Sequence, residues 1–243
     1  MALVRLELNT FCAALARVCR EQVLAEKWLL APSIRVGVQW LDAIARAGQP
    51  VLNVRVITPR QLAWSLAAPE LSKQGLAILG RRRAEVLVSR LIAKAGAGSQ
   101  SYLCALEPSP GLVRTLIQAI SDLRLAGLAA DDLADLSGRV FEVRDKGYEL
   151  RELVSAYEAE LERRGLADHA RVLHLAIARL ESDPPSQDTL VLAPEEVELK
   201  GLERTLWKRI PEPQRQRLPV DQKAGPETIQ FRFLAPLSGR SGM

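Results

Sequence analysis

The segment KWLLAPSIRVGVQWL, at residues 27–41, has the outline of a phosphate-binding loop: an apolar run, a short loop and the start of an amphipathic helix. A functional loop of this kind follows the pattern G-x-x-x-x-G-K-[ST]. Its glycines let backbone amides surround the phosphates, its lysine neutralises their charge and its hydroxyl holds magnesium. With Gly37 aligned to the second glycine, the other three positions hold Pro32, Val38 and Gln39. Proline restricts the backbone, valine carries no charge and glutamine is a poor magnesium ligand, so the sequence predicts a degenerate loop that binds no nucleotide.

Hydrolysis of ATP also needs acidic side chains at the end of a later strand, which hold magnesium and the attacking water. The apolar run LVL is followed by Ala193, Pro194, Glu195 and Glu196, so the strand-terminal position is an alanine. We interpret the two glutamates as a charged helix N-terminus, where the helix dipole favours carboxylates.

A second group of chemically capable residues is basic. Arg81, Arg82 and Arg83, with Arg90 and Lys94, lie on one expected helix and are suited to contact a nucleic-acid phosphate backbone. Runs of this kind also form solvated helix faces, and no aromatic residues lie between these for base stacking. Both readings stay open at this point.

The remaining polar residues predict no catalytic set, no metal site and no cofactor. His169 and His174 are five positions apart on an expected helix, about 140° around its axis, so they would not converge on one metal. Asp168 opens that helix, and capping explains its position. The cysteines form no CxxC pair, and we interpret all three as small core residues: Cys12, Cys19 and Cys104.

Hydrophobic patterning predicts the elements that position these residues. We expect a helix at 11–25, a buried strand at 28–31, a helix at 36–47, a strand at 51–58, a helix at 59–67 and, much later, a strand at 188–194. From about 75 to 182 the pattern is almost wholly helical, and after 183 the strand signal returns. Further strands are expected at 3–8 and 228–236, and the polar, proline-rich stretch 211–228 is interpreted as a linker or flexible loop.

This order predicts an α/β fold in which a parallel sheet is interrupted by a large all-helical insertion. The expected boundaries are 1–74 for the first part of the α/β domain, 75–182 for the insertion, 183–210 for the return to the α/β domain, and 211–243 for the linker and terminal strand. One interrupted domain is favoured over two consecutive domains, because the first part alone has too few strands for a stable sheet.

Bulk composition places the chain among globular proteins. It has 243 residues, 48% of them hydrophobic, and a net charge of +4, which is too weak to indicate nucleic-acid binding alone. The N-terminal residues lack the apolar core of a secretory signal, and no apolar run approaches the roughly 20 residues of a membrane span. We therefore expect a cytoplasmic protein with no membrane partner.

Several segments together resemble a known family. They are, in order, the strand followed by APS and arginine, NVRVITPRQLA, LIQAISDLRLAGL, LVSAYEAELERRGLADHARVL, and TLVLAP with LERTL. This series resembles the N-terminal half of the AddB-like helicase-nucleases. These are DNA-repair proteins related to UvrD and RecB helicases, and they carry a C-terminal PD-(D/E)XK nuclease domain. The resemblance covers roughly residues 25 to 235 and implies a RecA-like, P-loop-like sheet.

The resemblance also implies roles for individual residues. The stretch 31–37 matches the family's phosphate loop, Thr58 matches the place where a helicase strand meets DNA, and Asp168 matches an aspartate that opens a helix of the inserted subdomain. The residues expected to contact DNA are Ser33, Arg35, Thr58, Arg60, Arg81, Arg82 and Arg83.

The function implied is that of a non-catalytic, helicase-like module of a DNA recombination and repair system, which scaffolds a partner or holds DNA ends. Its expected partners are DNA, through backbone contacts, and a helicase or nuclease subunit. The chain is expected to be truncated before the second helicase half and the nuclease, or to be one part of a split protein. Two alternatives stay open: a protein-interaction domain with no DNA role, and a non-functional truncated remnant.

Overall fold

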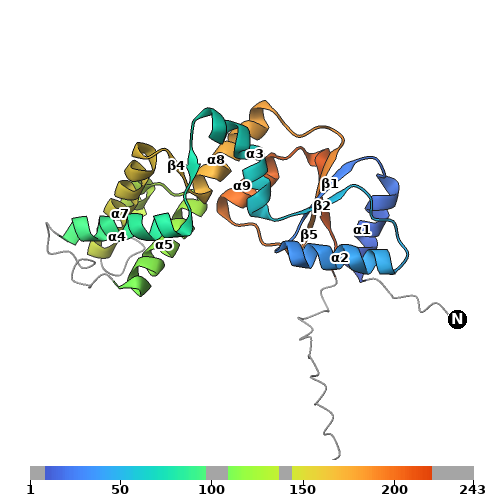
Figure 1. The fold of residues 1–243 in the computed structure, drawn as a ribbon, viewed down its shortest axis with the longest axis horizontal. Coiled ribbons are helices and arrows are strands. Elements are labelled where there is room, and N and C mark those ends of the chain that lie inside the picture. Colours follow the sequence, from blue (N-terminus) through green and yellow to red (C-terminus); the bar gives the residue numbers. More distant parts are fainter. Residues whose placement is uncertain (1–8, 97–108, 137–143, 221–243) are drawn as a thin grey trace, which may run out of the picture.

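The computed structural model describes residues 9–96, 109–136 and 144–220. At its centre lies a sheet of four parallel strands, in the order β2, β1, β5, β6. The strands are β1 (Glu26–Leu30), β2 (Val54–Ile57), β5 (Thr189–Pro194) and β6 (Arg215–Leu218). In the described ranges the sheet therefore combines two strands from early in the sequence with two from late in it (Figure 1).

Helices cover both faces of this sheet. On one face, α1 (Thr10–Glu21) and α2 (Ile34–Arg46) pack with Leu29 and Leu192, and the ring centroids of Phe11 and Trp40 lie 4.6 Å apart. On the other face, α3 (Pro59–Lys73), α8 (His169–Ser182) and α9 (Gly201–Arg209) pack with Leu30 and Val191. Successive strand residues point to opposite faces, so strands that are apolar at consecutive positions supply both cores.

Four further helices form a second group with a core of their own. They are α4 (Arg81–Gly96), α5 (Pro110–Leu125), α6 (Ala130–Leu136) and α7 (Arg144–Arg163). The buried side chains of this second core include Leu87, Val88, Leu116, Ile120 and Val154. In Figure 1 this group lies at one end of the molecule and the sheet at the other, with α3 and α8 between them. Two short parallel strands, β3 (Ala77–Ile78) and β4 (Leu166–Ala167), pair beside α8.

Local sequence explains where several helices begin. The side chains of Asn9, Ser109 and Asp168 each accept a hydrogen bond from the amide three residues later, which is the N-cap arrangement. Pro59 and Pro110 occupy first-turn positions, where the missing amide hydrogen costs nothing. Such starts are readable from sequence because cap and helix are contiguous.

The predicted α/β class is confirmed, as are the strands expected near residues 28–31, 51–58 and 188–194. Cys12 and Cys19 are buried, as expected. Cys104 and the strands expected at 3–8 and 228–236 lie outside the described residues. Among the helices in the described ranges, none is long and apolar enough to cross a membrane.

Residues 211–228 were expected to form a linker, and for part of this stretch that expectation is wrong. Residues 215–218, RQRL, form the edge strand β6, and Leu218 is fully buried. The polar side chains are held by the fold, because Arg215 donates to the carbonyl of Trp207 at 3.0 Å and Arg217 donates to that of Pro194 at 2.8 Å. The guanidinium of Arg217 also lies 4.9 Å from the centre of the Trp207 ring.

Candidate nucleic-acid interface

Two of the predicted DNA-contacting residues lie at the same edge of the sheet. Leu30 of β1 pairs with Ile57 of β2, so the residues that follow these parallel strands emerge side by side. Ser33 follows β1 and caps α2, and Thr58 follows β2 and caps α3. Crevices at the carboxyl ends of parallel strands are the usual ligand sites of α/β sheets.

Both hydroxyl groups serve the helices that they open. Ser33 Oγ accepts a hydrogen bond from the amide of Val36 at 3.3 Å. Thr58 Oγ1 accepts from the amide of Gln61 at 3.2 Å, and Gln61 Oε1 accepts from the amide of Thr58 at 3.0 Å. The second arrangement is a capping box, which fixes the direction in which α3 leaves the sheet.

Arg35 and Arg60 lie in the first turns of these two helices, and both side chains are exposed. The N-terminal turn of a helix carries a partial positive charge, to which each guanidinium adds a full one. The edge over β1 and β2 therefore presents two cationic side chains and two helix N-termini, an arrangement that attracts phosphate groups.

The segment aligned with a phosphate loop is shorter than that alignment requires. Only Ala31, Pro32 and Ser33 separate β1 from α2, and Gly37 lies inside the helix. The amide of Gly37 donates to the carbonyl of Ser33 at 3.1 Å, within the helical pattern. Consequently this amide is committed to the helix and does not line a phosphate cradle.

Gly37 has a packing role instead. A Cβ atom at this position would lie 2.2 Å from Cγ1 of Val56, so the absence of a side chain lets α2 approach β2. Val38 and Gln39, which take the lysine and hydroxyl positions of the motif, are exposed on the outside of α2. Neither position therefore supplies the lysine charge or the magnesium-binding hydroxyl that the motif requires.

The neighbouring part of the same edge is acidic. Glu195 and Glu196 follow β5 and are exposed, and the amide of Glu195 donates to the carbonyl of Leu218 at 3.0 Å. Their interpretation as a helix N-terminus is wrong, because α9 begins only at Gly201 and the glutamates lie in the preceding turn and loop. The acidic turn confines favourable phosphate contact to the half of the edge over β1 and β2.

The three consecutive arginines lie elsewhere. Arg81, Arg82 and Arg83 form the first turn of α4, in the second helical group, and all are exposed. Arg81 pairs with Glu85 at 3.1 Å. The structure thus brings Ser33, Arg35, Thr58 and Arg60 to the sheet edge but places the arginine triplet on a different element.

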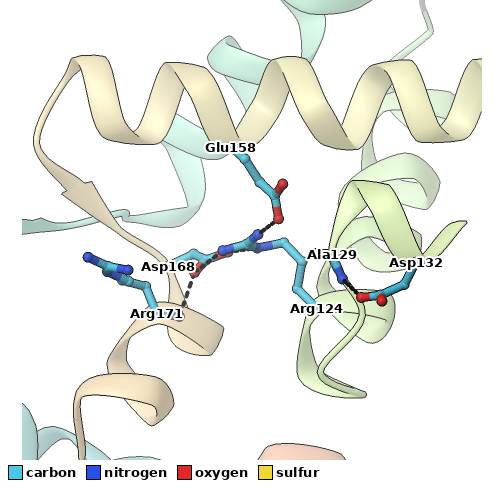
Figure 2. Close-up of polar contacts among 6 residues, drawn as sticks. All are labelled: Arg124, Ala129, Asp132, Glu158, Asp168 and Arg171. Carbon is cyan, nitrogen blue, oxygen red and sulfur yellow. Dashed lines mark hydrogen bonds and ion pairs between the residues drawn. The ribbon is translucent and has the colours of Figure 1, made fainter. Parts of the chain in front are cut away.

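Asp168 has a second role that its sequence position does not reveal. Its carboxylate caps α8 by accepting from the amide of Arg171 at 2.9 Å, as expected for a helix start. It also accepts from Nε of Arg124 at 2.7 Å, while the same guanidinium donates to Glu158 of α7 (Figure 2). Arg124 and Asp168 are both nearly buried, with 12% of each side chain exposed. One arginine therefore joins α5, α7 and the start of α8.

Tyr157 completes this cluster. Its ring lies beside the Arg124 guanidinium, with 5.8 Å between the guanidinium carbon and the ring centre. Burial, together with the charge of Asp168 and a hydrogen bond to it, raises the pKa of the Tyr157 hydroxyl. Burial also raises the pKa of Glu158, against the opposing charge of Arg124. Arg124 pairs with both carboxylates, so the cluster joins α5, α7 and the start of α8.

The two histidines do not meet. His169 Nε2 lies 3.7 Å from Glu203 of α9, whereas His174 lies more than a turn further along α8. In residues 9–96, 109–136 and 144–220, no group of three or more His, Cys, Asp or Glu side chains is arranged to hold a metal ion.

The sequence matches no protein-family model and no curated protein.

Proposed function

We propose that this chain is a non-catalytic, RecA-like module of an AddB-like DNA recombination and repair system, and that it contacts the DNA backbone. The observation that carries the proposal is the pairing of two arginine-bearing helix starts, at Ser33 with Arg35 and Thr58 with Arg60, on one edge of a parallel sheet. Phosphates are the anions that such an edge suits best.

The sheet order supports a RecA-like assignment. From β1 the chain moves to β2 on one side, and from β5 it moves to β6 on the other, so the direction reverses between β1 and β5. A reversal of this kind marks a ligand crevice between β1 and β5 in α/β proteins, and the proposed contact surface lies beside that crevice, over β1 and β2. The all-helical insertion expected at 75–182 is found in part: α4 to α7 share a core of their own, whereas α8 packs against the sheet and the short strands β3 and β4 also lie in this range.

The proposal of a non-catalytic module rests on the loop after β1. Its three residues are too few to wrap a triphosphate, and the buried Ala193 occupies the β5 position where an acidic residue would be needed. Titration with Mg·ATP should show no binding at micromolar concentration. Micromolar binding that is lost in Ser33→Asp, which keeps an N-cap but adds negative charge, would contradict this part of the proposal.

DNA contact is tested by measuring affinity against salt concentration. Arg35→Gln and Arg60→Gln should each weaken binding and each reduce the slope of log K against log salt by about one. Arg17→Gln is the matched control, because Arg17 is an exposed arginine on α1 that pairs with Glu21. If the wild-type chain binds no DNA at low salt, the DNA role is wrong.

One observation favours the alternative of a protein-interaction domain. A groove of about 600 Å³ lies between α4 and α5, lined in part by Val86, Pro110 and Val113. Val86 is 52% exposed, which is high for a valine on a packed helix. A chain that lacks DNA binding, but whose assembly with a helicase or nuclease subunit is lost in Val86→Asp, would establish this alternative.

A further inference from the structure

An exposed tryptophan lies close to the basic edge of the sheet. Trp64, on α3, is 47% exposed, whereas its helix neighbours Leu62, Ala63, Leu66 and Ala67 are buried. Arg60 lies four residues earlier, about 6 Å along the helix axis, and so shares its face. Trp64 therefore belongs to the outward stripe of α3 and not to the core.

The indole lies between two hollows in the surface. One is a groove of about 310 Å³ between β2 and α3, lined by Arg55, Ile57, Gln61 and Ser65 as well as by Trp64. The other is a much smaller hollow that Trp64 shares with Arg60, Ile78 and His169. Gln61 also holds the capping box of Thr58, so this side chain links the groove to the edge described above.

The charge of these hollows favours an anionic occupant. The described lining of the larger groove contains one arginine and no acidic residue. Asp168 borders the smaller hollow, but its carboxylate is paired with Arg124 at 2.7 Å and so exerts a reduced repulsion. Arg55 and Arg60 thus flank the accessible ring of Trp64. Among the described residues that line the two hollows, no acidic side chain lacks a basic partner.

We propose that this surface binds single-stranded nucleic acid, with an unpaired base stacked on Trp64 and the adjoining phosphates held by Arg55 and Arg60. Aromatic platforms flanked by basic side chains bind single strands in this way because every base has a stacking face, whereas the bases of a duplex are already stacked. The inference rests on the proposed DNA-binding function and specifies its ligand as single-stranded.

A competing occupant is an extended peptide. β2 is an edge strand of the sheet, and edge strands accept additional strands. The cationic lining and the link to the Thr58 edge through Gln61 favour nucleic acid, which leaves peptide binding as an outcome of the test.

The test compares three labelled ligands by fluorescence anisotropy: a thymidine oligonucleotide of about 15 residues, the same backbone without bases, and a duplex of equal length. The wild-type chain should bind the single strand most tightly. Trp64→Ala should weaken single-strand binding about tenfold or more, with little change for the abasic backbone or the duplex. Trp64→Phe should retain most of the affinity because it keeps an aromatic face.

Tyr148→Ala is the matched control, since Tyr148 is an aromatic residue of α7 with a similar exposure of 51%. Thermal unfolding of each variant shows whether it remains folded. The inference is overturned if Trp64→Ala binds the single strand as tightly as the wild-type chain does. It is also overturned if the wild-type chain binds the thymidine oligonucleotide and the abasic backbone equally. Salt-dependent binding through Arg35 and Arg60 in such a case would leave the proposed function intact. Absence of all DNA binding would overturn both this inference and the proposed function. In that case, binding of an extended peptide to β2 would explain the groove.

Discussion

Gly37 of α2 and Val56 of β2 approach so closely that a Cβ atom on the glycine would lie 2.2 Å from Cγ1 of the valine. The same Cβ would lie 3.1 Å from that of Ala31. The glycine that suggests a phosphate loop in the sequence is therefore required where a helix crosses an edge strand.

We predict that Gly37→Ala destabilises the fold, because α2 must move away from β2 to accommodate one methyl group. The expected loss is about 1–3 kcal/mol, the usual cost of overpacking, and urea unfolding followed by circular dichroism would measure it. The double variant Gly37→Ala with Val56→Ala should recover part of the loss. Gly80→Ala is the control, because a Cβ there meets no atom within 4 Å. Equal losses at Gly37 and Gly80 would show that backbone effects, and not the contact with Val56, are responsible.

Arg124→Leu should destabilise the chain more than any exposed arginine substitution. It leaves Asp168 and Glu158 without their shared cation in a nearly buried site, a change that costs about 3–5 kcal/mol. Arg114→Leu, an exposed position on the same helix, should cost far less. Similar denaturation midpoints for the two variants would mean that the cluster does not stabilise the joint between α5, α7 and α8.

The raised pKa of Tyr157 predicts a loss of stability in alkali. Above the ordinary tyrosine pKa of 10.0, the unfolded chain releases the proton of this hydroxyl while the folded chain retains it. Because the unfolded state then binds fewer protons, the free energy of unfolding should fall as pH rises above this value. Tyr157→Phe has no proton to release, so its stability should fall less steeply between about pH 10 and 11. Parallel curves for the two proteins would contradict this assignment.

Substitutions at Thr58 should separate capping from DNA contact. Thr58→Ala removes the capping box and should cost about 1 kcal/mol of stability, with DNA affinity nearly unchanged. Thr58→Asp keeps a capping oxygen, so its stability should stay near that of the wild type, while its negative charge should weaken DNA binding. Denaturant unfolding and DNA titration on the same samples measure both effects. If Thr58→Asp binds DNA as tightly as the wild type does, the DNA does not contact this edge.

Sequence patterns predicted the elements whose signals are local. The strand ending at Leu30 is an apolar run, and α3 begins with Thr58 and Pro59, a cap followed by a first-turn proline. The strand β5, with its sequence TLVLAP, is apolar because both of its faces are buried. In each case the information lies within a few consecutive residues.

Features that depend on distant partners could not be predicted. β6 reads RQRL, and its arginines are accommodated only because carbonyl groups of other segments accept their hydrogen bonds. Asp168 was identified as a cap, but Arg124 lies 44 positions earlier with no periodicity connecting the two. For the candidate interface, the sequence singled out Ser33, Arg35, Thr58 and Arg60 as expected contacts. The exposure of Trp64, within the predicted helix 59–67, became evident only from the folded chain.

The pairing of β1 with β5 sets the order in which the chain can be assembled. Glu26 of β1 is aligned with Thr189 of β5 in the centre of the sheet. The ribosome therefore synthesises β5 long after β1, the strand with which it pairs. Closing so long a loop is slow, and until then β1 and β2 offer an uncovered apolar edge. The helices α4 to α7, which lie in sequence between β2 and β5, bury a core of their own. Once they are folded, the flexible chain that must close for β1 to meet β5 is shorter. Premature termination within α7 should therefore leave a chain that aggregates, even though all of β1 and β2 has been made.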